Sequence, residues 1–205
     1  MLQYIDRETK EKKVEKVYGG GLIRFLYGKG SFIRPLVTSF SLFSRFYGWV
    51  QKRGFTKGKI APFIEKYGMD AAEFADQVES FSSFNDFFVR KLKPSARPIA
   101  SSHGVMPADA RYLFFPNISL ADRFYVKGQK LNLPQLLRSS ELAKTYENGT
   151  VIFARLCPVD YHRFHFPFDC VAGKSKLING PLMSVNPLPL SKNIMILSQN
   201  KRVIT

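Results

Sequence analysis

The sequence predicts an α+β fold in which N-terminal amphipathic helices precede a β-rich domain. Between residues 32 and 92, apolar side chains recur every three or four positions, which is the spacing of helices. After about residue 100, short apolar runs are separated by glycine, proline, asparagine and aspartate, as in a small sheet-rich domain. The chain has 205 residues, enough to bury a core, and we divide it into a helical region, 1–80, and a β-rich region, 81–205.

The first helical pattern covers residues 32–50. Seven apolar positions would line one side of this helix: Phe32, Leu36, Phe40, Phe43, Phe46, Tyr47 and Val50. Such a stripe is typical of a helix that faces a core. The aromatic density and the neighbouring Arg45, Trp49, Lys52 and Arg53 also suit a helix in the lipid headgroup layer, where apolar burial and attraction to anionic lipid add together. Both interpretations stay open, and these four residues are the candidate membrane-binding residues.

The net charge indicates a negatively charged partner. The chain has 31 Lys and Arg against 16 Asp and Glu, a net charge of +15, and residues 1–68 hold 14 basic and 5 acidic side chains. The partner is expected to be nucleic acid or an anionic lipid surface. Nucleic acid is disfavoured because the basic residues alternate with bulky Phe and Leu, whereas a groove binder keeps its arginines free to reach phosphates. No apolar run reaches the roughly 18–20 residues that cross a bilayer.

Further elements follow in chain order. Residues 60–79 predict a second helix. Helical spacing in the next segment is shared by four apolar residues, Phe84, Phe87, Phe88 and Leu92, and Pro94 and Pro98 close that segment. Strands are then predicted for four apolar runs: RYLFFP (111–116), FYVKG (124–128), TVIFARL (150–156) and CVAG (170–173).

Two of the three histidines, His162 and His165, lie three positions apart in VDYHRFHFP. Alone, such a pair is more typical of surface or packing histidines than of catalysis. A zinc site would need a third ligand such as Asp160 or Asp169, and no metal-binding spacing supplies one, so we predict no metal. Cys157 and Cys170 lie thirteen apart without a CxxC pairing, which favours a reducing compartment over a disulfide framework.

Five stretches of the second region occur in a distinctive order and spacing: FNDFFVRKLKPSARPI (84–99), MPADARYLF (106–114), VKGQKLNLPQLL (126–137), RLCPVDYHRFHFPFD (155–169) and NGPLMSVNPL (179–188). Together they resemble the N-terminal part of phosphatidylserine decarboxylase proenzymes, and the final NKRVIT also fits. Any single stretch is a weak signal, whereas five in the family's order are specific. The resemblance is strong over about residues 80–205 and looser over the basic helical region.

The resemblance implies an enzyme that makes its own cofactor, a covalent pyruvoyl group. Proenzymes of the family cut themselves at a Gly-Ser bond in a Gly-Ser-Thr segment near their C-terminus. The serine oxygen attacks the preceding carbonyl, the ester eliminates, and the new N-terminus becomes a pyruvoyl group. This ketone reacts with the amine of phosphatidylserine and acts as an electron sink for the loss of CO2. The implied function is the decarboxylation of phosphatidylserine to phosphatidylethanolamine in phospholipid biosynthesis.

The same resemblance assigns roles to three residues. Asp109 and His165 match the family's acid and histidine that together activate the serine, with the carboxylate orienting the base. His162 matches the other family histidine, which meets the substrate and could give the proton that replaces CO2. Histidine suits both tasks because its ordinary pKa lies near neutrality. His103 has no such setting and is predicted to be a loop residue.

The sequence departs from the family in three places. No Gly-Ser-Thr segment is present, so the domain is expected to be incomplete at its C-terminus and unable to form the pyruvoyl group alone. Ala110 and Cys170 stand where the family usually has glycine. If either position needs a positive φ, a side chain there costs roughly 1–2 kcal/mol and could turn Asp109 away from its histidine. An alternative is therefore a catalytically inactive remnant that acts at most as a peripheral membrane-binding protein.

These inferences define the expected partners and location. The chain would be the large-chain part of the enzyme and would bind a C-terminal small chain that carries the pyruvoyl group. Phosphatidylserine and an anionic membrane surface would be its other partners, and nucleic acid would not. We expect a peripheral protein on the cytoplasmic face of the cell membrane. Association into a homo-oligomer is left open.

Overall fold

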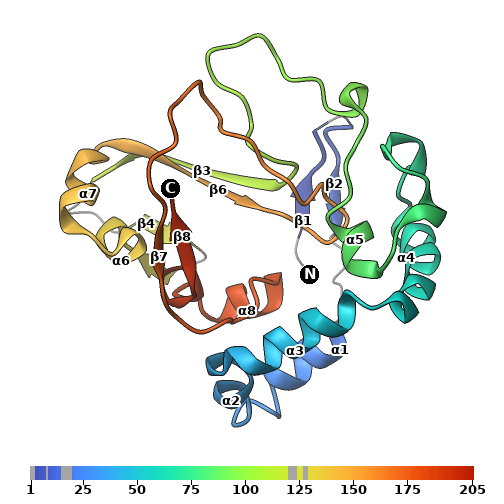
Figure 1. The fold of residues 1–205 in the computed structure, drawn as a ribbon. Helices are drawn as coiled ribbons and strands as arrows, with labels where there is room; N and C mark the ends of the chain where they lie inside the picture. Colours follow the sequence, from blue (N-terminus) through green and yellow to red (C-terminus); the bar gives the residue numbers. More distant parts are fainter. Residues whose placement is uncertain (1–2, 8, 15–19, 120–123, 127–128) are drawn as a thin grey trace. The chain divides into compact units, whose positions relative to one another are not determined.

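The computed structural model describes residues 3–7, 9–14, 20–119, 124–126 and 129–205, and combines helices with small two-stranded sheets (Figure 1). The predicted α+β class is confirmed. Contacts divide the chain into unit 1 (1–44, 113–153 and 172–205) and unit 2 (45–112 and 154–171). The division at residue 80 stays a prediction. No helix within the described ranges is long and apolar enough to cross a membrane.

Unit 1 contains short paired strands. Three pairs are antiparallel: β1 (Gln3–Ile5) with β2 (Lys12–Val14), β4 (Phe124–Val126) with β5 (Gln129–Leu131), and β7 (Lys176–Ile178) with β8 (Arg202–Ile204). The fourth pair is β3 (Arg111–Ile118) with β6 (Gly149–Arg155). The predicted strands that begin at residues 111, 124 and 150 are therefore confirmed.

Two details of the strand prediction differ. Lys127 and Gly128, the last residues of the run predicted at 124–128, lie outside the described residues. The run predicted at 170–173 forms no strand, and Val171 is almost fully exposed. All four residues of this run are exposed, so its apolar pattern does not correspond to a buried strand.

The helices of unit 1 were predicted only in its N-terminal part. That part holds α1 (Gly20–Leu26) and α2 (Arg34–Ser39), while four helices interrupt the region predicted to be β-rich: α6 (Leu133–Leu137), α7 (Ser140–Thr145), α8 (Pro187–Lys192) and α9 (Ile196–Gln199). Three of these four begin at a side-chain cap: Asn132, Ser139 and Asn186 each accept a hydrogen bond from a backbone N–H of the first turn. Such caps were a readable signal in the sequence.

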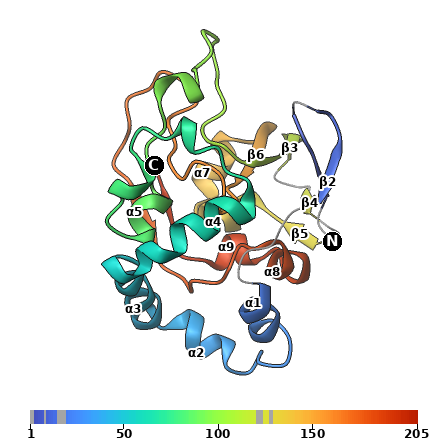
Figure 2. The same cartoon turned by 90° about the vertical axis from the view of Figure 1, so that its right-hand side faces the viewer.

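Unit 1 is held together by an apolar core and by contacts of Tyr27. Ile118, Leu131 and Ile194 are buried together, with partly buried side chains from β3, β6, α8 and α9 around them. Beside this core, α1 lies next to α8 (Figures 1 and 2). The Tyr27 hydroxyl accepts a hydrogen bond from the Ser184 N–H, and Lys192 donates to the Tyr27 carbonyl. These bonds join segments more than 150 residues apart in the sequence.

The single helix predicted over residues 32–50 is in fact two helices. α2 ends before Phe40, whose backbone is extended, and α3 (Ser41–Gln51) begins after it. In a continuous helix the Thr38 carbonyl would accept from the N–H of residue 42, but it accepts from the Leu182 N–H instead. The apolar period does not reveal this break because the competing donor lies far along the chain.

Unit 2 is built on an aromatic core. η1 (Gly54–Lys59), α4 (Ile60–Tyr67) and α5 (Phe84–Phe88) surround it, and α4 and α5 lie side by side in both views (Figures 1 and 2). The buried members of the core are Ile60, Phe63, Phe74, Phe81, Phe84 and Phe87. Thr56, which is fully buried, donates to the Arg53 carbonyl and accepts from the Phe84 N–H, which ties η1 to α5.

α4 and α5 are both shorter than predicted. The helix predicted over 60–79 ends at Tyr67, because Gly68 adopts a left-handed conformation and its N–H bonds back to the last turn. Short turns η2 (Ala71–Glu73) and η3 (Val78–Ser80) follow. α5 ends at Phe88, and Leu92 forms a bridge with Phe74 in place of a further helical turn. A last short turn, η4 (Pro94–Ala96), precedes Arg97.

Gly180 gives a stability prediction for unit 1. A Cβ at this position would lie 2.1 Å from the Gln199 carbonyl oxygen and 2.8 Å from Lys201 N, both backbone atoms that cannot rotate away. Gly180→Ala is therefore expected to destabilise the chain by about 1–3 kcal/mol, measured by urea unfolding. Gly173, whose Cβ would meet nothing within 4 Å, is the matched control, and Gly173→Ala should change stability by less than about 1 kcal/mol. Equal effects of the two substitutions would contradict the prediction.

Candidate active site

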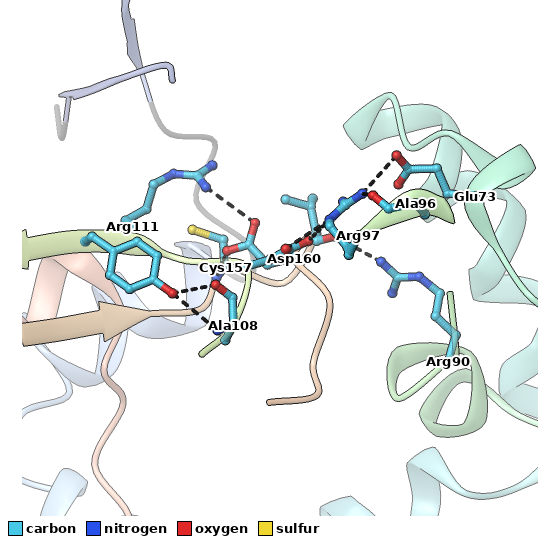
Figure 3. Close-up of polar contacts among 11 residues, drawn as sticks. Glu73, Arg90, Ala96, Arg97, Ala108, Arg111, Cys157 and Asp160 are labelled. Carbon is cyan, nitrogen blue, oxygen red and sulfur yellow. Dashed lines mark hydrogen bonds and ion pairs between the residues drawn. The ribbon is translucent and has the colours of Figure 1, made fainter. Parts of the chain in front are cut away.

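The segment that carries the two histidines begins with a tight turn in unit 2. The Asp160 carboxylate accepts from the Cys157 N–H at 2.6 Å, and the Asp160 N–H donates to the Cys157 carbonyl at 2.9 Å. Arg111 forms an ion pair with Asp160 at 3.4 Å (Figure 3). Asp160 is buried. It therefore shapes the turn.

His162 is packed against α5. Its ring stacks on Phe88, with 4.1 Å between centroids, and its Nε2 lies 2.9 Å from the Cys157 carbonyl oxygen. A carbonyl oxygen only accepts, so Nε2 carries the proton and Nδ1 is the nitrogen that can accept another. Burial lowers the pKa of His162 below its ordinary value, although the Cys157 carbonyl opposes that shift. The ring is therefore held as a neutral imidazole at neutral pH.

The pKa of His162 should respond to Phe88. Because burial is the main cause of the lowered pKa, Phe88→Ala is expected to move the midpoint upward towards 6.5, as followed by NMR of the imidazole protons. Between the lowered pKa and 6.5 the unfolded state binds more protons than the folded state. His162 therefore reduces stability as the pH falls through this window, and Phe88→Ala should narrow the window. Val89→Ala changes the neighbouring residue of the same segment and should leave the midpoint in place. A midpoint that Phe88→Ala does not raise would contradict this.

His165 lies on a segment that pairs with the segment before Asp109. The His165 N–H donates to the Pro107 carbonyl, and the Val105 N–H donates to the Pro167 carbonyl, each at 2.9 Å. Two segments about sixty residues apart in sequence are thus brought side by side. The His165 side chain is exposed, and within the described part of the chain no hydrogen bond joins its ring to the Asp109 carboxylate.

Asp109 faces Arg97 instead. Arg97 Nε lies 3.0 Å from Asp109 Oδ1 and 2.8 Å from Oδ2, and its guanidinium also bonds Glu73 at 3.0 Å (Figure 3). Burial alone would lower the pKa of Arg97, but the hydrogen bonds with Glu73 and Asp109 outweigh it and raise that pKa. Tyr112 bonds both the N–H and the carbonyl of Ala108, the residue before Asp109. The structure thus places the carboxylate through contacts that the sequence analysis did not identify.

Arg90 and Arg163 join the segment that carries His162 and His165 to the residues just after α5. Arg90 donates to the Val159 carbonyl at 3.0 Å, and Arg163 donates to the Val89 carbonyl at 3.1 Å. Arg90 is buried over the rings of Phe74 and Phe87, at 4.9 and 5.2 Å from their centroids. Burial lowers its pKa, against the opposing charges of Asp109 and Glu73. The two arginines hold the segment by reciprocal side chain to backbone bonds.

A cavity of about 240 Å³ in unit 2 lies beside this network. Arg90, Arg97, Asp109 and Asp160 are among its lining residues, and Tyr67, the last residue of α4, and Met69 also line it. Neither predicted histidine is among the described residues that line it. The predicted acid therefore lines this cavity, whereas the two predicted histidines do not, although all three residues belong to unit 2.

Ala110 and Cys170, which stand where the family usually has glycine, cause no backbone strain. Non-glycine residues with positive φ in the described ranges are Lys10, Asn117, Arg138 and Asn148. Ala110 and Cys170 are described and are not among them, so the conditional cost of a side chain at these two positions does not arise. Cys157 is buried and Cys170 is exposed.

The candidate membrane-binding residues are all exposed in unit 2. Arg45 and Trp49 lie on α3, and Lys52 and Arg53 follow its end. The Arg53 guanidinium lies 4.0 Å from the centre of the Trp49 ring, which also stacks with Phe46.

As for metals, no group of three or more His, Cys, Asp or Glu side chains that could hold an ion occurs among the residues that the structure describes.

Comparison with known proteins gives consistent matches. The profile of the family described as phosphatidylserine decarboxylase matches residues 84–205. The chain is 45% identical over 207 residues to the phosphatidylserine decarboxylase proenzyme of Chlamydia pneumoniae, covering 99% of the chain and 69% of that relative. It is 45% identical over 210 residues to the proenzyme of Chlamydia caviae and 43% identical over 208 residues to that of Chlamydia felis, covering all of the chain and 70% of each relative.

Proposed function

The chain belongs to the phosphatidylserine decarboxylase family, and on this premise we propose that it is the large-chain part of a self-processing carboxy-lyase. The reaction is the decarboxylation of phosphatidylserine to phosphatidylethanolamine in phospholipid biosynthesis. The observation that carries the proposal is that nearly the whole of this chain aligns with relatives that are named as proenzymes. That name implies cleavage into two chains, and the partner chain would be the small one.

The pyruvoyl group, derived from a serine of the small chain, would supply the ketone that serves as the electron sink for the loss of CO2. The described residues fit a serine brought by another segment. His165 is exposed, and its ring has no hydrogen bond within the described part of the chain, so its nitrogens are open to a hydroxyl group. A base of this kind needs a nearby carboxylate to orient it, and Asp109 lies on the paired segment.

Each of the three residues then has a distinct task. His165 takes the proton of the serine hydroxyl during self-cleavage, and Asp109 orients His165 and stabilises its charged form. His162 gives the proton that replaces CO2. Because its Nε2–H is bonded to the Cys157 carbonyl, the transferred proton leaves from Nδ1. In the neutral ring Nδ1 carries no proton, so His162 first takes one there from water; because burial lowers the pKa of His162, the charged ring then gives that proton up readily.

The proposal is tested by supplying a serine segment of the kind that family proenzymes cleave. The chain would be extended in frame by, or co-expressed with, a family segment that carries Gly-Ser-Thr. We expect cleavage at the Gly-Ser bond, a small chain whose intact mass shows a pyruvoyl terminus, and release of labelled CO2 from carboxyl-labelled phosphatidylserine. The control replaces the serine of the added segment by alanine, which should abolish all three signals. Absence of cleavage and of CO2 release from the serine-containing protein would favour the inactive remnant.

The exposed aromatic and basic residues support a second part of the proposal, peripheral binding at the cytoplasmic face of the cell membrane. Arg45, Lys52 and Arg53 supply positive charge around Trp49, and further exposed apolar side chains belong to the same stretch, including Phe46, Tyr47 and Phe55. Charge attracts anionic lipid while the rings enter the headgroup layer. Such binding would bring the enzyme to the surface that holds its lipid substrate.

Charge reversal should remove this binding. The triple substitution of Arg45, Lys52 and Arg53 by glutamate is expected to weaken sedimentation with phosphatidylserine-containing liposomes by roughly a hundredfold, because each basic residue near an anionic surface contributes about 1 kcal/mol. The matched control reverses three exposed lysines of the same unit, Lys66, Lys91 and Lys93, and alters the net charge equally. The control should bind almost normally. Equal losses, or unchanged sedimentation of the first variant, would remove the role of this surface.

A further inference from the structure

Building on the proposed function, we propose that Arg97 is the positioning residue of the site: it orients the Asp109 carboxylate and thereby acts on the self-cleavage step through Asp109. Arg97 contacts neither histidine in the described part of the chain. Its effect on the reaction must therefore pass through the carboxylate that it holds.

The contacts of Arg97 define the direction of Asp109. Its Nε–H is shared by both oxygens of Asp109, at 3.0 and 2.8 Å, and one Nη donates to Glu73 at 3.0 Å. One guanidinium thus joins two carboxylates that come from positions 36 residues apart. Among the described residues, no other cationic side chain forms a hydrogen bond or ion pair with Asp109. The nearby Arg90 donates its hydrogen bond to the Val159 carbonyl instead.

The backbone holds Arg97 in place for this task. The Lys93 N–H donates to the Glu73 carbonyl at 2.9 Å, and the bridge between Phe74 and Leu92 continues that pairing. The Arg97 guanidinium also folds back onto the Ala96 carbonyl at 2.6 Å. The segment that carries Arg97 is therefore anchored to the segment that carries Glu73, and the side chain has few alternative directions.

The bond to Arg97 leaves Asp109 able to act. Each carboxylate oxygen can accept about two hydrogen bonds, and Arg97 uses one on each, so capacity remains for an imidazole N–H. Both partners are partly exposed, with 43% of the Arg97 and 25% of the Asp109 side chain accessible. Ion pairs with this exposure add little to stability. Loss of Arg97 should consequently affect the reaction much more than the fold.

The test is a double-mutant cycle in the extended proenzyme, with the rate of self-cleavage as the readout. Arg97→Met is expected to slow cleavage by roughly a hundredfold, the scale of a misplaced reacting group, and to shift the melting temperature by less than about 2 °C. Arg97→Lys keeps the charge without the guanidinium geometry and should recover part of the rate. The matched control, Lys93→Met, removes an exposed positive charge four residues away and should cleave normally. In the Asp109→Asn background, Arg97→Met should cause no further loss.

The outcomes distinguish a failure of the positioning role of Arg97 from a failure of the proposed decarboxylase function. Wild-type rates in Arg97→Met, a full additional loss in the Asp109→Asn background, or a large fall in melting temperature would overturn the positioning role. If the wild-type proenzyme itself does not cleave, the proposed function fails, and NMR of the 205-residue chain still tests the contact. The Arg97 Nε–H resonance should shift in Asp109→Asn and stay in place in Asp86→Asn, which removes a carboxylate bonded to Ser82. An unchanged resonance in Asp109→Asn would overturn the inference.

Discussion

Replacing Phe87 by alanine is expected to lower the free energy of unfolding by about 3–5 kcal/mol, the cost of deleting a fully buried aromatic ring. Phe87 has no exposed surface. Four aromatic rings lie within 6.0 Å of its centroid, those of Phe63, Phe74, Phe81 and Phe84. The neighbours come from several elements that also pack on one another, so they cannot collapse into the space without breaking other contacts.

Phe87→Ala should also loosen the segment that carries His162 and His165. Arg90 lies over the Phe87 ring, and its hydrogen bond to the Val159 carbonyl joins that segment to the residues just after α5. The measurement is urea unfolding followed by circular dichroism. Phe55→Ala is the control, because this ring is 74% exposed, and its removal should change stability by no more than about 0.5 kcal/mol. A cost below about 1 kcal/mol for Phe87→Ala would mean that the aromatic core is not packed as described.

Replacing His165 by asparagine should slow self-cleavage of the extended proenzyme by about 10²–10⁴-fold, the usual contribution of a general base. Asparagine keeps a polar side chain of similar reach but cannot take a proton from the serine. Because the His165 backbone bond to Pro107 does not depend on the side chain, the pairing of the two segments should survive. The measurement is the fraction of cleaved chain against time on a denaturing gel.

Two other histidines serve as comparisons for this variant. His103→Asn changes an exposed histidine outside the proposed site, so it should cleave at the wild-type rate. The His162→Asn variant should cleave itself at the wild-type rate. The cleaved enzyme should then release CO2 slowly, because His162 is assigned to the decarboxylation step. Normal cleavage by His165→Asn would remove this residue from the mechanism. Slow cleavage by all three variants would indicate a general structural effect in place of a specific base.

Local patterns in the sequence predicted the class of the fold and the segments of the site. Strands β3 and β6 followed from short apolar runs bounded by turn residues, and the likeness of five stretches to one family identified the segments that carry Asp109, His162 and His165. The end of α4 at Gly68 and the caps at Asn132 and Ser139 were also readable. These features depend on neighbours within a few residues, so the linear order of the chain contains them.

The tertiary structure alone decided which distant groups meet. The partner of Asp109 is Arg97, the Val159 carbonyl receives Arg90 from 69 residues away, and the break after α2 depends on Leu182. A residue's type states which bonds it can make, but which partner arrives depends on the path of the whole chain. For this protein the sequence determined the kind of chemistry present, and the fold determined the directions in which its charged groups point.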